Sequence, residues 1–200
     1  MRAFEKIFVE SLDDLHSWLL ANHSQQESVW LVKWKKDYGP TYISYDEIVD
    51  ELMCFGWVDS LPKNLNEEKT MLLLSPRNPK SNWAKVNKER VDRLIKVGKM
   101  MEAGLKMVEI AQQNGTWNFL DDVEKLILPD DLKEAFENNP KANYYYERFP
   151  RSSKRGILEW IKNAKQENTR KKRIEETVEK ASENRKANHH VGRDKGPKEA

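Results

Sequence analysis

Residues 29–36 follow the pattern of a β-strand, and this segment constrains the fold more than any other. Trp30, Val32 and Trp34 occupy every second position, with one leucine and two lysines between and after them. A period of two places the indoles on one face of a strand and most of the polar side chains on the other. We therefore expect a sheet whose indole face is buried.

Further strands are predicted at residues 57–61 and 70–75, and the polar loop between them suits an antiparallel pair. Capping-box patterns at Ser11 and Ser44 open two helices within the same part of the chain. From residue 76 onward the periodicity is helical. The sequence thus predicts an α+β fold, in which a small antiparallel or mixed sheet with helices precedes an all-helical C-terminal part.

The length of 200 residues allows one domain with an appendage, or two small domains. We expect an α+β domain over 1–120, a helical region over 121–184 and a disordered tail over 185–200, where periodicity is lost. The mean hydropathy of −0.87 and the lack of a long apolar run argue against a membrane span. Acidic residues follow the N-terminus too early for a secretory signal, so the expected location is the cytoplasm.

Most catalytic signatures are absent from this sequence. A single cysteine, Cys54, excludes an internal disulfide and a cysteine-based zinc site, and its place on a predicted buried helix edge indicates an inert core residue. No glycine-rich nucleotide loop, no G-x-S-x-G and no H-E-x-x-H occurs. We therefore predict no catalytic residue, no metal and no cofactor.

The predicted helix over 83–98 carries the clearest candidate site. Asn87 and Arg90 fall within its apolar arc, where an unpaired guanidinium is costly. Asp59, beside Trp57, is the expected partner of Arg90. Two interpretations remain open: a buried structural ion pair, or a pocket for an anion with a flat or apolar body. The candidate ligand-binding residues are Trp57, Asp59, Arg77, Lys80, Trp83, Asn87 and Arg90.

Charge is segregated along the chain, although the net charge is only +2. Residues 1–74 hold 7 basic and 13 acidic side chains, whereas residues 141–173 hold 11 basic and 3 acidic ones. Such blocks dock onto each other or attract partners: cationic peptides for the acidic block, nucleic acid or an anionic surface for the basic one. The candidate basic stripe comprises Arg148, Arg151, Lys154, Arg155, Lys162, Lys165, Arg170, Lys171, Lys172 and Arg173.

Two segments resemble the YdeI/OmpD-associated family, also called the bacteriocin-protection or OmdA-like family. They are residues 45–60, YDEIVDELMCFGWVDS, and residues 75–100, SPRNPKSNWAKVNKERVDRLIKVGKM. The resemblance continues through shorter segments and covers about residues 5–183. Ser60 stands where the family usually has glycine, and Ala84 stands where serine is common.

The resemblance implies a small cytosolic bacterial protein with an α+β N-terminal part and a helical C-terminal part. It also implies an association with an outer-membrane porin and with resistance to bacteriocins or cationic antimicrobial peptides. No catalytic residue carries over. The expected function is a non-enzymatic, stress- or resistance-associated binding protein with an anion-accepting pocket. The alternatives are a binder of nucleic acid or anionic surfaces through the basic stripe, and an enzyme of unknown reaction at the same pocket.

Overall fold

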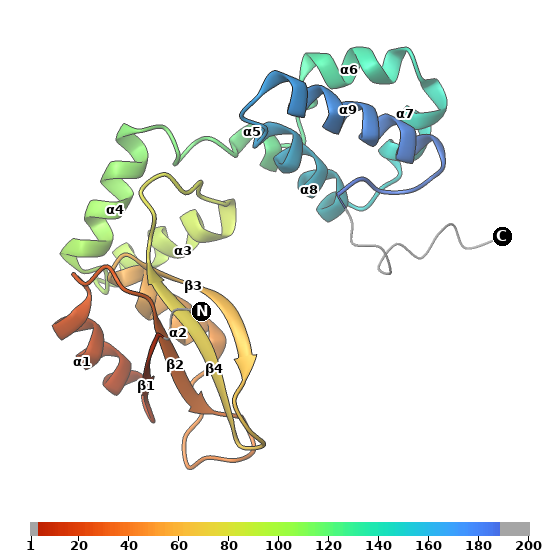
Figure 1. The fold of residues 1–200 in the computed structure, drawn as a ribbon. Helices are drawn as coiled ribbons and strands as arrows, with labels where there is room; N and C mark the ends of the chain where they lie inside the picture. The colour runs from red at the N-terminus through yellow and green to blue at the C-terminus, as the bar shows by residue number, and fades with distance from the viewer. Residues whose placement is uncertain (1–3, 189–200) are drawn as a thin grey trace. The chain divides into compact units, whose positions relative to one another are not determined.

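The computed structural model describes residues 4–188 of the chain (Figure 1). The chain divides into two compact units, Met1–Phe119 and Leu120–Ala200. No helix among the described residues is both long enough and apolar enough to cross a membrane. A mixed sheet with helices forms the first unit and helices alone form the second, which confirms the predicted fold class.

Four strands build the sheet of the N-terminal unit, in the order β1-β2-β4-β3. β1 pairs with β2 in parallel, and the two other pairings are antiparallel. A parallel pair needs a crossover connection, which α1 supplies. The strands are β1 (Glu5–Phe8), β2 (Val29–Trp34), β3 (Trp57–Asn64) and β4 (Lys69–Pro76).

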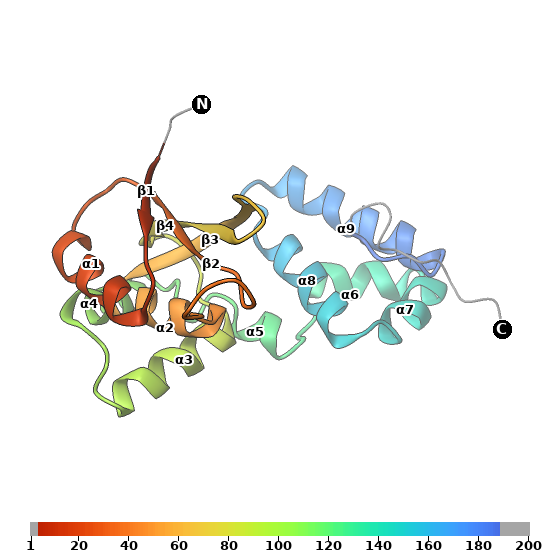
Figure 2. The ribbon, with the colours of Figure 1, turned by 90° about the horizontal axis from the view of Figure 1, so that it is seen from below.

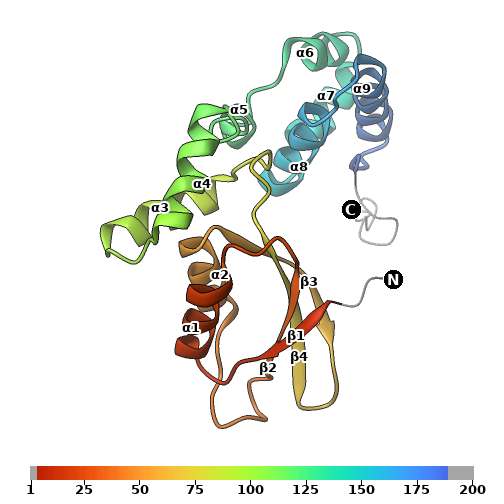
Figure 3. The same ribbon diagram turned by 60° about the vertical axis from the view of Figure 1, so that its left-hand side comes forward.

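Helices α1 and α2 lie on the same side of this sheet (Figure 3). Both begin at the predicted capping boxes, in which Ser11 and Ser44 each accept a hydrogen bond from the backbone three residues on. The helix predicted over 83–98 begins two residues later than expected, because Ala84 stands at the N-cap of α3. The helices are α1 (Leu12–Asn22), α2 (Tyr45–Cys54), α3 (Lys85–Lys96) and α4 (Glu102–Gln113).

The aliphatic face of β2, and not its indole face, belongs to the core. Leu31 is fully buried, whereas Trp30 and Trp34 are only half-buried. The alternation was therefore correct and the choice of face was wrong, because strand periodicity alone does not say which face the helices cover. Trp34 instead meets Phe8 edge to face at 5.7 Å, and the Lys69 ammonium lies 4.2 Å from the Trp34 ring.

Helix α4 packs closely against the C-terminal end of α2. A side chain at Gly104 would place its Cβ 2.3 Å from the Cys54 carbonyl oxygen, so only glycine fits there. Gly56 follows α2 with a φ of 72°, which reverses the chain into β3, as the sequence predicts. The backbone N–H of Met101 donates to the same Cys54 carbonyl at 3.2 Å and ties the start of α4 to α2.

The C-terminal unit is all-helical, with α9 alongside α6 and α7 (Figure 2). Leu132, Tyr146 and Ile157 are among its buried side chains. Ala187 is also buried, although a disordered tail is expected from residue 185; residues 189–200 of that tail lie outside the described part. The helices are α5 (Asp121–Glu124), α6 (Asp130–Glu137), α7 (Pro140–Glu147), α8 (Arg151–Lys162) and α9 (Glu167–Ser182).

Candidate functional site

Arg90 is ion-paired, but not with the partner that the sequence suggests. Its side chain is 15% exposed; Nη2 lies 2.8 Å from Asp46 Oδ1, and Nη1 lies 2.5 Å from Asp50 Oδ1. Asp59 instead accepts a hydrogen bond from the Tyr45 hydroxyl at 2.9 Å, so the predicted Arg90–Asp59 pair is wrong. The α3 arginine therefore binds α2, and an anion at Arg90 would compete with two carboxylates.

Asp50 holds a second arginine of α3 as well. Arg93 Nη2 donates to both oxygens of the Asp50 carboxylate at 2.7 Å. Burial raises the pKa of Asp50, but the hydrogen bonds from Arg93 and Arg90 outweigh this effect and leave the pKa below its ordinary value. This carboxylate stays ionised at neutral pH and links α2 to α3.

Arg77 is a buried cation without a carboxylate partner among residues 4–188. Its guanidinium stacks 3.6 Å from the centre of the Trp83 ring, and Nη2 donates to the Asn82 carbonyl at 3.1 Å. Nε has no hydrogen-bond partner, and burial lowers the pKa of the guanidinium to about 10. Trp83 in turn packs on Trp117, with 5.0 Å between ring centres.

The other predicted residues of this site lie in different environments. Trp57 packs edge to face on Trp18, and its indole N–H donates to the His23 carbonyl at 2.9 Å. Lys80 is exposed in the loop before α3, and Asn87 is half-buried on α3. The structure therefore brings Arg77 and Trp83 into contact and places Arg90 in a separate ion-pair cluster.

Most of the basic stripe is engaged within its own unit. Arg155 lies 2.8 Å from Glu124 and 2.7 Å from Glu159, and Arg170 pairs with Asp131 at 2.6 Å. Carbonyl oxygens accept hydrogen bonds from Arg148, Arg151, Lys154 and Arg173. Docking of basic side chains onto acidic ones thus accounts for much of the charge block, while Lys165, Lys171 and Lys172 are exposed.

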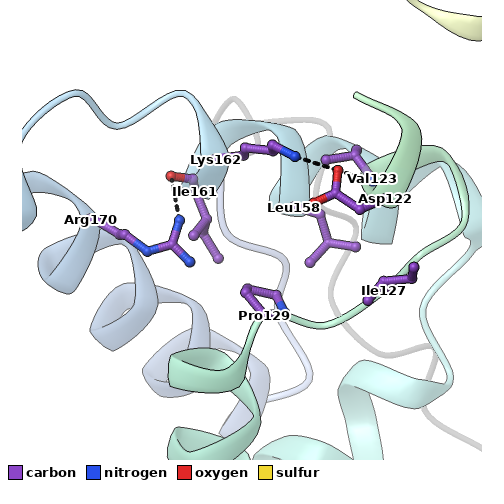
Figure 4. Close-up of a pocket in the computed structure, with 8 residues that line it drawn as sticks. All are labelled: Asp122, Val123, Ile127, Pro129, Leu158, Ile161, Lys162 and Arg170. Carbon is purple, nitrogen blue, oxygen red and sulfur yellow. Dashed lines mark hydrogen bonds and ion pairs between the residues drawn. The ribbon is translucent and has the colours of Figure 1, made fainter. Parts of the chain in front are cut away.

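A cavity of about 240 Å³ lies between α5, α8 and the start of α9 (Figure 4). Three buried side chains, Val123, Leu158 and Ile161, contribute to an apolar lining. Polar groups stand at the same cavity: Lys162 lies 2.5 Å from Asp122, and Arg170 donates to the Ile161 carbonyl at 3.5 Å. Its lining residues are Asp122, Val123, Ile127, Pro129, Leu158, Ile161, Lys162 and Arg170.

The turn after α5 shapes one wall of this cavity. Leu126 has a φ of 57°, a left-handed conformation that is unfavourable for a leucine. Its N–H donates to the Val123 carbonyl at 3.0 Å, and the N–H of Ile127 donates to the Asp122 carbonyl at 2.9 Å. These two bonds close the end of α5 and direct Ile127 and then Pro129 along the cavity.

Of the residues that line this cavity, only Lys162 and Arg170 are candidate site residues from the sequence, where they belong to the basic stripe. A helical spacing of three and four residues from Leu158 to Ile161 and Lys162 was the available signal. It shows that these side chains share a face of α8, but not that a cavity lies over that face.

Asp131 and Asp122, which pair with Arg170 and Lys162, should make the folded protein less stable in acid. The hydrogen bond from Arg170 lowers the pKa of Asp131. Burial raises the pKa of Asp122, but the hydrogen bond and charge of Lys162 together with backbone hydrogen bonds leave it below its ordinary value. A folded-state pKa below the unfolded value of 3.8 stabilises the fold above pH 3.8, and this contribution is lost as the pH falls further. We expect about 1 kcal/mol in total, because solvent screens both pairs. Urea unfolding between pH 5 and pH 2 measures this, and in an Asp131→Asn variant the dependence should shrink.

Cys54 is expected to be unreactive in the folded protein. It is buried in the core as predicted, and burial, with smaller effects from Glu51 and Asp50, raises the pKa of its thiol to about 12. Because the thiolate is the nucleophile, labelling by a disulfide reagent near pH 7.5 should be about a thousandfold slower than for an exposed thiol. Denaturant should restore the ordinary rate. Fast labelling without denaturant would show that the end of α2 opens readily.

Two family models match this chain. Residues 7–107 match a domain of unknown function, DUF8412, and residues 125–184 match the OmdA family, described as bacteriocin-protection, YdeI or OmpD-associated. The DUF8412 model spans half of the chain, so the chain belongs to that family, and residues 125–184 carry an OmdA domain. The OmdA match confirms the predicted resemblance, while the motifs at residues 45–60 and 75–100 fall within the DUF8412 match. No curated protein and no solved structure matches this chain.

Proposed function

We propose that this OmdA-family protein is a non-enzymatic binding protein associated with resistance to bacteriocins or antimicrobial peptides. Its ligand is an anion with an apolar body, and its site is the cavity between α5, α8 and α9 (Figure 4). One observation carries the proposal: five apolar side chains line the same cavity as the cations of Lys162 and Arg170, and the Asp122 carboxylate that also lines it is paired with Lys162. Apolar walls with a few placed polar groups are typical of small-molecule sites.

Arg170 is the group best placed to hold the anion. Its Nε and Nη2 donate to Asp131 at 2.6 and 2.8 Å, which fixes the plane of the guanidinium. Nη1 makes only a 3.5 Å contact with the Ile161 carbonyl, a weak hydrogen bond. A ligand carboxylate can therefore accept from Nη1 without breaking the pair with Asp131, and charge-assisted bonds of this kind are strong.

Octanoate tests the proposal, with octanamide as its uncharged counterpart. Ile127 lines the cavity and is 55% exposed, so substitution there should leave the fold intact. We expect Ile127→Glu to weaken octanoate binding by about tenfold or more, because it adds a like charge beside the ligand. Ile127→Lys, of similar length and opposite charge, should preserve or strengthen binding. Isothermal titration of the full chain measures octanoate binding to the wild type and to both variants.

Equal binding of octanoate and octanamide, or an Ile127→Glu variant that binds as well as the wild type, would refute the anion site. A short single-stranded DNA tests the alternative in the same experiment. DNA binding that falls steeply with salt and is lost on changing Lys165, Lys171 and Lys172 to glutamine would instead assign function to the basic stripe. That triple variant should bind octanoate normally.

A further inference from the structure

A histidine–glutamate pair joins α1 to α2 in the N-terminal unit. His16 Nδ1 lies 2.7 Å from Glu51 Oε1, and the Glu51 side chain is only 11% exposed. The His16 ring is also held by Phe55, with 5.3 Å between ring centres in an edge-to-face arrangement. Because a carboxylate only accepts hydrogen bonds, Nδ1 is the donor. The imidazole is thus fixed in orientation.

His16 and Glu51 line a cavity of about 370 Å³ together with residues of the α3–α4 connection. Gly98, with a φ of 70°, ends α3, and the Lys99 N–H then donates to the Leu94 carbonyl at 3.0 Å. The close contact of α4 with the end of α2 holds this connection in place. The lining residues are Leu12, Asp13, His16, Glu51, Gly98, Lys99 and Met101.

The charges of this cavity are divided between its two walls. Helices α1 and α2 contribute Asp13 and Glu51, both acidic, and the ring of His16. The α3–α4 connection contributes the ammonium of Lys99. Within residues 4–188, neither Asp13 nor Lys99 takes part in an ion pair.

We propose that this cavity binds an α-amino acid with an apolar side chain. The ligand ammonium meets Asp13, the ligand carboxylate meets Lys99, and the side chain contacts Leu12 and Met101. A simple anion would face Asp13 and Glu51, and a simple cation would face Lys99, so a zwitterion matches the two walls better than either. This site is in the DUF8412 unit and does not depend on the octanoate cavity.

Leucine and its two blocked derivatives test the proposal on the full chain. L-Leucine should show saturable binding at millimolar concentrations by isothermal titration or NMR. N-acetyl-L-leucine, which lacks the ammonium, and L-leucinamide, which lacks the carboxylate, should each bind about tenfold more weakly, because each leaves one wall without its ion pair.

Two variants test which wall of the cavity binds the ligand carboxylate and which binds the ligand ammonium. Lys99→Gln should weaken leucine about tenfold and leave leucinamide unchanged, whereas Asp13→Asn should weaken leucine and leave N-acetyl-leucine unchanged. Lys96→Gln is the matched control, because Lys96 is exposed on α3 and does not line the cavity. Thermal melting of each variant checks that the fold is intact. Absence of saturable leucine binding, or a Lys99→Gln variant that treats leucine as the wild type does, would overturn the proposal; neither result would affect the octanoate site.

Discussion

Replacing Gly104 with alanine is expected to destabilise the N-terminal unit by about 2 kcal/mol or more. The added Cβ would lie 2.3 Å from the Cys54 carbonyl oxygen and 2.6 Å from that of Met53. Both contacts are with backbone, so α2 and α4 must move apart. Overpacking of this kind costs about 1–3 kcal/mol or more, which exceeds the gain of roughly 1 kcal/mol from the better helix propensity of alanine. Urea unfolding followed by tryptophan fluorescence measures the change.

Gly156 provides the matched control for this substitution. It lies inside α8, and an added Cβ there meets nothing within 4 Å. Gly156→Ala should therefore stabilise the C-terminal unit by about 1 kcal/mol, since alanine loses less conformational entropy in a helix. Replacing glycine with alanine should thus lower the free energy of unfolding at Gly104 and raise it at Gly156. A neutral Gly104→Ala variant would show that α2 and α4 separate without cost.

Replacing Arg77 with methionine is expected to stabilise the protein by about 2 kcal/mol. The guanidinium is buried without a carboxylate partner among the described residues, and one of its N–H groups is unpaired. Replacing even a buried ion pair with apolar side chains of similar size is often neutral or stabilising by about 1–4 kcal/mol, and an unpaired buried charge is costlier still. Methionine also keeps a contact with the Trp83 ring, while the lost bond to the Asn82 carbonyl offsets part of the gain.

Two further variants separate charge from volume at this position. Arg77→Ala removes the charge and the packing against Trp83, so it should be less stable than Arg77→Met by about 2 kcal/mol. Lys80→Met removes a charge from the same loop at an exposed position and should change stability by less than about 0.5 kcal/mol. A destabilised Arg77→Met variant would mean that the guanidinium makes a net favourable contribution to folding. If Arg77→Met is more stable, the charge is kept at a cost to the fold, as is usual for groups that serve a function.

Part of the environment of Arg90 can be predicted from the sequence. Helical periodicity places Arg90 within an apolar arc, and the cost of an unpaired buried charge requires an acidic partner. The structure confirms that the partner is acidic. The partner was wrong because Asp46 is explained equally well by the positive end of the α2 dipole, and periodicity within α2 and α3 does not show which faces of the two helices meet.

The cavity of the C-terminal unit is harder to predict from the sequence. Its shape depends on Leu126 in a left-handed conformation, which residue preferences assign to glycine or asparagine. No local pattern predicts such a backbone at a leucine; it is imposed by the packing of the surrounding helices. The capping boxes at Ser11 and Ser44, by contrast, are determined within four residues and were predicted correctly.

The strand order has a consequence for how the sheet assembles as the chain folds. β3 and β4 are joined by a short loop, so their pairing closes a small segment and loses little chain entropy. β1 meets β2 only after the whole of α1 has been positioned between them, and it pairs along one edge over four residues. We expect the β3–β4 hairpin to form early, with β2 adding to it, and β1 to join last and to separate first. Amide hydrogen exchange should accordingly be fastest in β1 and slowest in β4, which belongs to the early hairpin and lies between β2 and β3.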